Sequence, residues 1–360
     1  MPHAPWTPLS DAPTFPRDGY APLADRMAAL LHTRNDVLLI QGEAVVALEA
    51  VAHSLGRQGV RALNLVSSLY GRWFGGWLRQ AGAEVIDLAA EDGKPLQAEE
   101  VRHALAGGGF DLVFVVHAES AYGILNPLPE IVAAAKAAGA LLVVDAVASI
   151  GGHRVDVDAL GIDVAVIGPQ KSLSGQAGVS AISVSPSAWA RVAPAGAAPS
   201  ILSLADQRDL WLNTGRGALP GTPSALEFHA LSQCLDRVFA EGLHNIEARH
   251  QIAARISRAG ALALTGRQWV VPEQASNLVT ATPLPDGLTA DTLLAQAPDG
   301  HALSAGVGAA GQRLIRLNHT GARATPHVVL GDLLVLGQAL RAAGQSVDIP
   351  KALAAAGAAA

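Results

Sequence analysis

Short apolar runs alternate along this chain with segments of helical spacing that end at glycine. The runs at 36–41, 111–118 and 141–147 carry nearly continuous Val, Leu and Ile rather than an apolar–polar alternation. Continuous apolar strands are covered on both faces, and their alternation with helices predicts a mostly parallel sheet with helices on either side. In such α/β sheets, ligands bind at the carboxyl ends of the strands. Residues that directly follow an apolar run are therefore the first candidates for a functional site.

The pattern changes along the chain and divides it into four parts. Residues 1–22 are expected to form an irregular N-terminal arm, because five prolines fall within the first sixteen positions and proline is disfavoured in helix interiors and central strands. Residues 23–222 carry the alternating pattern and are expected to form the large domain. Residues 223–345 begin with a long helical segment and continue with shorter strands, which predicts a smaller α+β domain. The Ala-rich residues 346–360 are expected to be a flexible tail.

The charge and cysteine content argue against several classes of protein. The formal net charge is −6 and no basic block occurs, so nucleic acid is not expected as a partner. Cys234 is the single cysteine, which excludes an internal disulfide and a multi-cysteine zinc site, and no metal is expected. The long apolar stretch 131–151 is interrupted by Lys136 and Asp145, so no membrane span is expected. Because the N-terminus lacks a basic-then-apolar signal pattern, the cytoplasm is the expected location.

Two ionisable residues directly follow apolar runs. Asp145 ends the run at 141–145, and Lys171 comes shortly after the run at 164–167. Both are therefore expected at the carboxyl edge of the sheet, where ligands bind. An ionised side chain is costly to bury without a partner, so the two residues could form a structural ion pair, or Lys171 could be a solvated loop lysine. Taken together, they form a candidate catalytic pair.

The residues around this pair resemble the class V aminotransferases, enzymes that depend on pyridoxal phosphate. The matching blocks are VDAVASIGG at 144–152 and DALGIDVAVIGPQKSLSGQAG at 158–178, with 26 positions from Asp145 to Lys171. The resemblance extends from about residue 36 to about residue 341. It implies the aspartate-aminotransferase-like fold (fold type I), a mostly parallel seven-stranded large domain plus a small C-terminal α+β domain. It also implies a transaminase with small-molecule substrates that works as a homodimer.

Within that resemblance, Lys171 and Asp145 are the catalytic residues. The Lys171 amine would bond to the aldehyde carbon of pyridoxal and, once released by an amino substrate, would move a proton. Asp145 would pair with the pyridine nitrogen and keep it protonated, so that the ring withdraws electrons. Val147 would pack on one face of the ring and Tyr70 on the other, whereas the alternative for Tyr70 is a place in the core.

Further residues match binding positions of the family. Ser120, in the block HAESAYG, matches a hydroxyl residue beside the ring oxygen, and His117 of the same block is interpreted as structural. Arg316 matches the arginine that holds the substrate carboxylate as a two-pronged fork; the alternative is an exposed arginine on a strand. Gln170, just before the lysine, is assigned to cofactor binding. Thr222 matches a phosphate-binding residue that the neighbouring subunit supplies.

The turn at Gly42, Glu43 and Ala44, also assigned to cofactor binding, departs from the family pattern. It joins an apolar run to a helical segment, where backbone N–H groups and the helix dipole favour a phosphate. The family has Ser or Thr at Glu43, and the tyrosine expected at Leu219 is absent as well. Two like charges about 4 Å apart repel by roughly 1 kcal/mol in water and several times more in a partly desolvated pocket. A hydroxymethyl group would instead donate a hydrogen bond to Glu43; the alternative is that Glu43 serves only as a helix N-cap.

We therefore expect a class V aminotransferase that moves an amino group between a B6 vitamer or amino acid and a small 2-oxo acid. The favoured reaction is pyridoxamine plus pyruvate giving pyridoxal plus L-alanine, because family members that take the unphosphorylated vitamer resemble this chain at 42–50, 63–77 and 200–211. The cofactor is pyridoxal 5'-phosphate or, preferred here, unphosphorylated pyridoxal or pyridoxamine as substrate. Two features depart from those members: Val307 stands where they carry a second arginine, and no N-terminal Gly-Pro loop precedes residue 36.

Other functions stay open at this point. An ordinary pyridoxal-phosphate aminotransferase, with alanine or serine as donor and glyoxylate or pyruvate as acceptor, would have to hold its phosphate beside Glu43. A non-catalytic nucleotide-binding protein would need G-x-G-x-x-G after the first strand, where the chain offers Gly42 alone. A desulfurase of the same fold would need a nucleophilic cysteine in a mobile loop, and Cys234 lies within a helical segment.

Overall fold

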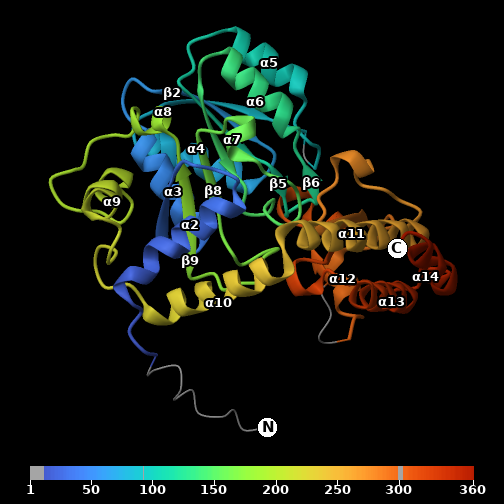
Figure 1. Cartoon of the computed structure of the whole chain (residues 1–360). Coiled ribbons are helices and arrows are strands. Elements are labelled where there is room, and N and C mark those ends of the chain that lie inside the picture. Colours follow the sequence, from blue (N-terminus) through green and yellow to red (C-terminus); the bar gives the residue numbers. More distant parts are fainter. Residues whose placement is uncertain (1–11, 92, 299–302) are drawn as a thin grey trace.

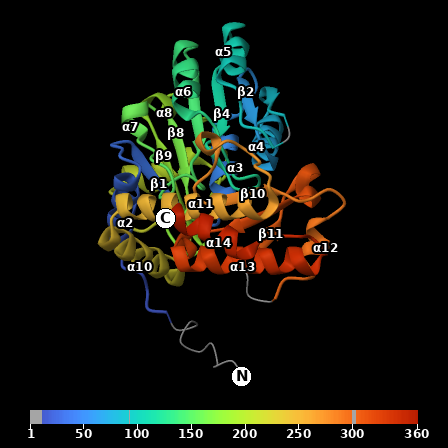
Figure 2. The same ribbon diagram turned by 90° about the vertical axis from the view of Figure 1, so that its right-hand side faces the viewer.

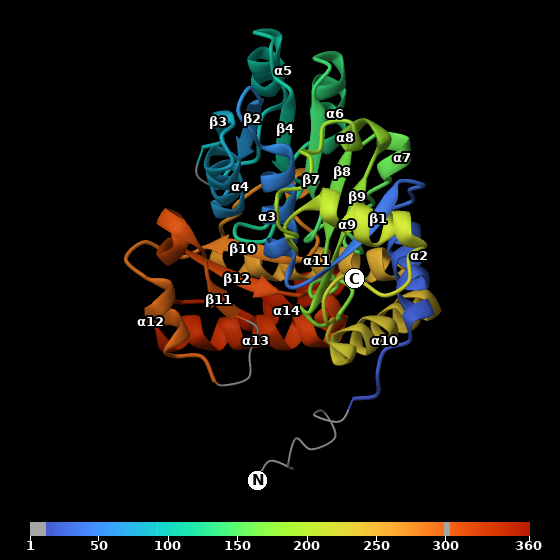
Figure 3. The same cartoon turned by 90° about the vertical axis from the view of Figure 1, so that its left-hand side faces the viewer.

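The computed structural model describes residues 12–91, 93–298 and 303–360, and it consists of a large α/β part and a smaller α+β part (Figure 1). The large part is built around a seven-stranded sheet whose strands lie in the order β1 (Asp36–Gln41), β9 (Val179–Val184), β8 (Val164–Ile167), β7 (Leu141–Asp145), β4 (Leu112–Val116), β2 (Arg61–Val66) and β3 (Glu84–Ala89). Only β9 is antiparallel to its neighbours, β1 and β8, and the other neighbouring pairs are parallel. The expected mostly parallel, seven-stranded α/β architecture is confirmed (Figure 3).

Burial explains the apolar composition of the central strands. Every residue of β4, β7 and β8 is buried, as expected when helices cover both faces of a sheet. The edge strand β3 is largely exposed and accordingly carries Glu84 and Asp87. The helices of this part are α2 (Tyr20–Leu30), α3 (Ala44–Leu55), α4 (Leu69–Gln80), α5 (Ala98–Ala106), α6 (Leu128–Ala137), α7 (Val157–Leu160), α8 (Pro186–Trp189), α9 (Leu204–Leu210) and α10 (Ala225–Glu241). Beyond the end of β4, β5 (Ala118–Glu119) and β6 (Ile124–Leu125) pair as a short antiparallel ribbon.

The smaller part combines a three-stranded antiparallel sheet with a layer of helices. Its strands lie in the order β10 (Val279–Pro283), β12 (Leu314–Asn318) and β11 (Leu303–Ala305). Its helices are α11 (Leu243–Thr265), α12 (Ala290–Leu294), α13 (Pro326–Ala342) and α14 (Ile349–Ala358). Figure 2 shows α11 running across the molecule between the large sheet and α13. Short 3₁₀ helices complete the chain at η1 (Arg17–Gly19), η2 (Leu212–Thr214), η3 (Pro272–Gln274), η4 (Gly308–Arg313) and η5 (Gly321–Arg323).

The two hydrophobic cores do not divide at the predicted boundary between residues 222 and 223. Helix α10 packs against α2 and β9, and its Phe228 and Leu235 belong to the core of the large part. The second core begins at Ala253, inside α11. The chain therefore passes from one part to the other within a helix. The helical spacing of this segment shows that an apolar face exists but not which sheet that face covers. The boundary at 222/223 stays a prediction from the sequence, and the change from one core to the other falls within α11.

Residues 346–360 were predicted to be a flexible tail, but most of them form helix α14. Asp348 caps the helix by accepting a hydrogen bond from the Lys351 N–H. Ile349, Ala352 and Ala356 are buried against the second core, and α14 packs on both α11 and α13. Alanine has the highest helix propensity and permits close helix contact. The Ala-rich composition of this segment therefore suits a helix that packs closely against α11 and α13.

The predicted N-terminal arm is regular from residue 17 onward. Residues 1–11 of that arm lie outside the described residues, but η1 and the first turn of α2 fall inside the predicted range. Phe15 is buried, and its ring centroid lies 5.0 Å from that of Tyr20 and 5.7 Å from that of Phe228. This aromatic cluster fastens the start of the chain to α10.

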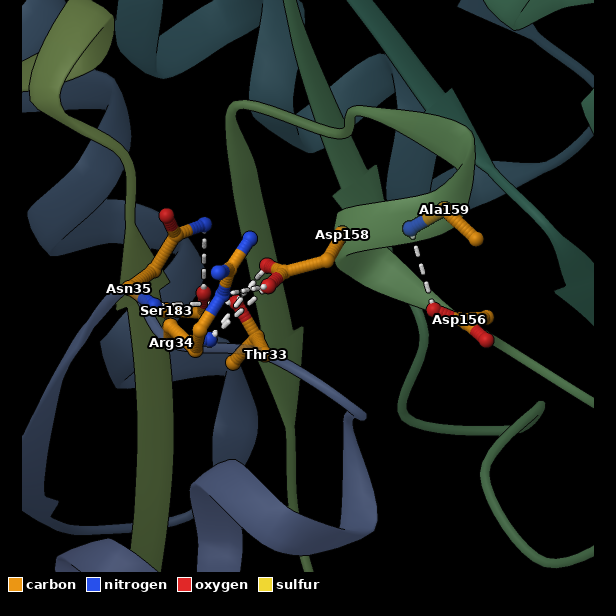
Figure 4. Close-up of polar contacts among 7 residues, drawn as sticks. All are labelled: Thr33, Arg34, Asn35, Asp156, Asp158, Ala159 and Ser183. Atoms are coloured by element: carbon orange, nitrogen blue, oxygen red, sulfur yellow. Dashed lines mark hydrogen bonds and ion pairs between the residues drawn. The ribbon is translucent and has the colours of Figure 1, made fainter.

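A polar cluster fixes the end of the large sheet that is opposite the carboxyl ends of the parallel strands. Asp158, on α7, accepts hydrogen bonds from Thr33 Oγ1 at 2.6 Å and from the Arg34 backbone N–H at 3.2 Å (Figure 4). The hydrogen bond from Thr33 helps to hold the pKa of Asp158 below its usual range. Asn35 Nδ2 donates to Ser183 Oγ at 3.4 Å. These contacts anchor the start of β1 and so help to position the strand.

Candidate active site

The predicted pair and most of the predicted binding residues line one pocket at the carboxyl ends of β1, β4 and β7. The pocket is lined by Glu43, Ala44, Val45, Leu48, Tyr70, Val116, Ala118, Glu119, Ser120, Asp145, Val147, Ala148 and Lys171. Segments more than a hundred positions apart therefore converge there because the parallel strands end on the same edge of the sheet.

Asp145 supplies a buried carboxylate to the pocket. It is the last residue of β7 and is 5% exposed. Its Oδ1 accepts a hydrogen bond from the Val147 backbone N–H at 2.9 Å. Burial raises the pKa of Asp145, Lys171 and the Val147 N–H oppose that rise, and Glu43 adds to it. A positively charged ligand group beside this carboxylate would offset the cost of its burial.

Lys171 reaches the same pocket from the loop after β8. Its Nζ donates a hydrogen bond to Ser120 Oγ at 3.0 Å. The same Nζ lies 5.6 Å from the centroid of the Tyr70 ring. The amine is thus held by one neutral hydroxyl and an aromatic ring, without a carboxylate in ion-pair distance among the residues that the structure describes. Lys171 and Asp145 therefore do not form the structural ion pair that was the alternative.

Tyr70 is a wall of the pocket rather than a member of the core. It lies in the first turn of α4, where its backbone N–H donates to Ser68 Oγ at 3.3 Å. Burial raises the pKa of the Tyr70 hydroxyl, and the carboxylates of Glu119, Asp145 and Glu43 raise it further. The phenol therefore stays neutral in this acidic surrounding. Val147, which also lines the pocket, is buried and presents an apolar surface.

Arg316 stands beside the pocket rather than among its lining residues. On β12, its Nε donates to the Ala305 carbonyl at 2.8 Å, and its Nη1 donates to the Ser120 carbonyl at 3.0 Å. Burial lowers the pKa of Arg316, while Tyr70 and Glu119 oppose that fall. The two carbonyls fix the plane of the guanidinium, and among the described residues no acceptor occupies its other N–H groups, which could bind a ligand carboxylate. This half-buried arginine is not a freely exposed strand residue.

Glu43 occupies the N-cap position of α3 and lines the pocket. Its Oε2 accepts a hydrogen bond from the Val45 backbone N–H at 2.9 Å. Its Oε1 accepts one from Gln170 Nε2 at 2.8 Å. Gly42, just before it, has φ +147, and a Cβ there would lie 3.0 Å from the Val46 side chain. The turn thus places a carboxylate where a helix N-terminus would otherwise face the ligand with free N–H groups.

Two polar residues of the site were not predicted from the sequence. Glu119 is fully buried, and its carboxylate accepts hydrogen bonds from the Ser68 hydroxyl and from the Ala121 backbone N–H. Burial raises the pKa of Glu119, which the bonds from Ser68 and Ala121 partly oppose. Ser68 in turn accepts from the N–H of Tyr70, so this acid supports the aromatic wall. An acid three positions after the apolar run that ends at Val116 was the available sequence signal.

Some predicted residues lie outside the pocket. Thr222 is exposed and does not line the pocket of its own chain, and its assignment to a neighbouring subunit stays a prediction. Leu219 is buried. Val307 packs against the small cluster that contains Tyr122, and it brings no charge to the site. His117 is buried, which lowers its pKa to about 4 and keeps it neutral. Over residues 12–91, 93–298 and 303–360 no His, Cys, Asp or Glu cluster suits a metal ion.

These residues fit a B6 group. A buried carboxylate that gains from a cationic ring nitrogen, a lysine amine without a carboxylate partner, and an aromatic wall are the features that a pyridine ring with an aldehyde or aminomethyl group requires. A seven-stranded α/β sheet that carries this set at its carboxyl edge defines a B6-dependent enzyme of fold type I. The chain belongs to the class-V aminotransferase family, whose family model matches residues 18–323.

Individual relatives agree with that assignment. The chain is 33% identical over 343 residues to pyridoxamine–pyruvate transaminase of Mesorhizobium japonicum, and the match covers 94% of this chain and 87% of the relative. The crystal structure of pyridoxamine–pyruvate aminotransferase from Mesorhizobium loti has a TM-score of 0.87 at 32% identity and covers 95% of this chain and 88% of that one. L-aspartate–glyoxylate aminotransferase of Paracoccus denitrificans is 27% identical over 352 residues, which cover 92% of this chain and 88% of the relative. The protein is therefore an aminotransferase.

No helix in the part of the chain that the structure describes is long and apolar enough to cross a membrane.

Proposed function

We propose that this aminotransferase takes an unphosphorylated B6 vitamer as substrate and catalyses pyridoxamine plus pyruvate giving pyridoxal plus L-alanine, reversibly. The observation that carries the proposal is the Glu43 carboxylate, which lines the pocket and accepts the Val45 N–H at 2.9 Å. This N–H is one of the donors that a phosphate would use at the start of α3. A phosphate carries close to two negative charges near neutral pH, so it would meet both an occupied donor and a like charge.

The size of this repulsion favours the bare vitamer. Two unit charges about 4 Å apart repel by roughly 1 kcal/mol in water and by several times more where water is partly excluded. A hydroxymethyl group carries no charge and has an O–H to donate to Glu43. The pocket already contains the carboxylates of Glu119 and Asp145, which makes a further anion still less favourable. Similarity to pyridoxamine–pyruvate transaminase of Mesorhizobium japonicum supports the same substrate.

Four residues of the site then have roles in the transfer of the amino group. A bound B6 ring supplies an electron sink for the carbon that loses a proton. Lys171 acts as the amine that takes and returns that proton, and the hydroxyl of Ser120 orients its Nζ. Asp145 holds a positive charge on the ring nitrogen. Arg316 binds the carboxylate of pyruvate or alanine, since its plane is fixed by two carbonyls and N–H donors remain. We further propose a homodimer in which Thr222 contributes to the neighbour's site.

An ordinary pyridoxal-phosphate aminotransferase that uses glyoxylate or pyruvate is the second candidate. It is favoured by one observation, namely that Glu43 is a genuine N-cap of α3 and so has a structural role that needs no ligand. Serine–glyoxylate aminotransferase of Methylorubrum extorquens, 29% identical over 275 residues, is also a relative. This candidate requires that the purified protein retain pyridoxal phosphate tightly.

Absorbance titrations of the wild type and Glu43→Ser with pyridoxal and with pyridoxal phosphate test the proposal. The wild type is expected to form the imine band with pyridoxal and to bind the phosphate form weakly. Glu43→Ser is expected to raise affinity for the phosphate form by about tenfold or more and to weaken affinity for pyridoxal, because a like charge becomes a neutral donor. Glu49→Ser, on the same helix and paired with His53 at 3.6 Å, is the matched control. Stoichiometric, tight binding of pyridoxal phosphate by the wild type would establish the second candidate instead.

A further inference from the structure

The side chain of Gln170 is committed to Glu43. Its Nε2 donates to Glu43 Oε1 at 2.8 Å, while the second carboxylate oxygen accepts the Val45 N–H at 2.9 Å. The two donors come from different elements, the loop before Lys171 and the first turn of α3. Together they fix both the position and the plane of the carboxylate. Each oxygen has a further lone pair for a ligand O–H.

The orientation of the Gln170 amide is determined by its surroundings. A Cβ on Gly168 would lie 2.2 Å from Gln170 Oε1, so the side chain lies directly over this glycine. The reversed amide would bring its oxygen against the Glu43 carboxylate, where two acceptors repel. The NH₂ group must therefore point to Glu43, and the absence of a side chain at Gly168 makes that arrangement possible.

This arrangement leaves an acceptor without a donor. Gln170 Oε1 is buried and has no hydrogen-bond partner among the described residues. A buried carbonyl without a donor destabilises a fold, whereas an apolar residue of the same shape would not carry that penalty. Packing alone therefore does not explain a glutamine at this position. The hydrogen bond to Glu43 does explain it, because an apolar residue at this position could not hold the carboxylate in place.

We infer that Gln170 is a positioning residue that determines vitamer specificity: it aims the Glu43 carboxylate at the hydroxymethyl group of the ligand, and while it does so its amide is withheld from a phosphate. The inference rests on the proposed function. It adds that recognition of the bare vitamer belongs to the Glu43–Gln170 pair rather than to Glu43 alone. Because Gln170 precedes Lys171 directly, the same loop carries the specificity residue and the reacting amine.

A comparison of four proteins tests this pair: the wild type, Gln170→Met, Glu43→Ser and the double variant. Dissociation constants for pyridoxal and for pyridoxal phosphate come from absorbance titration, and KM and kcat from alanine formation with pyridoxamine and pyruvate. Gln170→Met in the wild-type background is expected to raise the KM for pyridoxamine and the Kd for pyridoxal by about tenfold, as for the loss of one hydrogen bond to a charged group, with a smaller change in kcat. Its Kd for pyridoxal phosphate should not change.

In the Glu43→Ser background, Gln170→Met is expected to affect the other ligand. There the Gln170 amide is free, so its replacement by Met should weaken binding of pyridoxal phosphate and leave binding of pyridoxal unchanged. Gln176→Met, an exposed glutamine in the same loop, is the matched control and should behave as the wild type. Gly168→Ala offers a second route, because its Cβ displaces the Gln170 side chain without removing the amide, and it should raise the KM for pyridoxamine like Gln170→Met.

The outcomes separate the inference from the proposed function. If the wild type prefers pyridoxal but Gln170→Met matches Gln176→Met in every constant, the role of Gln170 is wrong and the proposed function stands. If the wild type itself prefers pyridoxal phosphate, the proposed function fails whatever the variants show. Equal effects of Gln170→Met in both Glu43 backgrounds would also overturn the inference, because the two residues would then act independently.

Discussion

Asp145 and Lys171 keep the family's residues and their 26-position spacing, whereas Glu43, which lines the same pocket, stands where the family has a hydroxyl residue. Asp145 and Lys171 form the proposed reacting pair. Glu43 is instead held by Gln170 and a backbone N–H at 2.8 and 2.9 Å. Under the proposed function, the first pair determines the reaction and the Glu43–Gln170 pair determines which ligand reacts, so the two properties should be separable by mutation.

Removal of the Lys171 amine should have the largest effect and should leave the Glu43–Gln170 pair intact. Lys171→Ala is expected to lower the transamination rate by about a thousandfold or more, because both the covalent partner and the proton carrier are lost. Alanine formation in single-turnover experiments measures the rate. Lys136→Ala, an exposed lysine on α6, is the control. Binding of pyridoxal without an imine band should persist in Lys171→Ala, and complete loss of vitamer binding would show that reaction and ligand choice are not separable.

Replacement of the guanidinium should affect the oxo acid and spare the vitamer. Arg316→Met is expected to raise the KM for pyruvate by about thirtyfold to a hundredfold, since a charged fork to the carboxylate is lost. The KM of Arg316→Lys for pyruvate should lie between those of the wild type and Arg316→Met, because lysine keeps the charge but lacks the planar guanidinium. Steady-state kinetics with each substrate varied in turn give both KM values, with Arg102→Met as an exposed control. A larger rise in the KM for pyridoxamine than for pyruvate would contradict the assignment.

The smallest expected effect concerns stability and its dependence on pH. Burial raises the pKa of Glu119 above its usual value of 4.5, so the native state keeps this proton to a higher pH than the unfolded chain does. The stability contributed by the protonated form is present below 4.5 and is lost as pH rises through the native pKa. Glu119→Gln cannot lose a proton, so its unfolding free energy relative to the wild type should rise between acid and neutral pH.

Denaturant unfolding at several pH values measures that difference, and Glu130→Gln, an exposed substitution on α6, should show no such trend. A relative stability of Glu119→Gln that falls as pH rises would mean that the buried carboxylate is stabilised in its charged form by its hydrogen bonds.

The sequence was sufficient to predict the sheet and to place Asp145 and Lys171 at the same edge of it, because both depend on local order. Continuous apolar runs predicted the buried strands, and strand ends placed Asp145 and Lys171 on one edge. The family resemblance added Tyr70, Ser120 and Arg316, whose positions in one region depend on contacts across the whole chain. Local pattern could not assign α10 to the first core or give α14 a docking surface, since an apolar helix face does not identify its partner.

Hydrogen-bond networks were the least predictable part of the site. Glu119 and Ser68 lie 51 positions apart, and nothing in either neighbourhood indicates that they meet. Glu43 was noticed because its charge conflicts with a local expectation, but its contact with Gln170, across 127 positions, required the structure. A departure from a pattern can be seen in a sequence, whereas the residue that compensates for it cannot.

Helix α11 has a mechanical consequence. It is 23 residues long, with Ile246 embedded in the first core and residues from Ala253 onward in the second. A joint made of a continuous helix resists the free swivelling that a loop allows, so reorientation of β12 and its arginine relative to Lys171 would require the helix to bend or to slide along its neighbours. The single continuous helix α11 therefore restrains the position of Arg316 relative to Lys171.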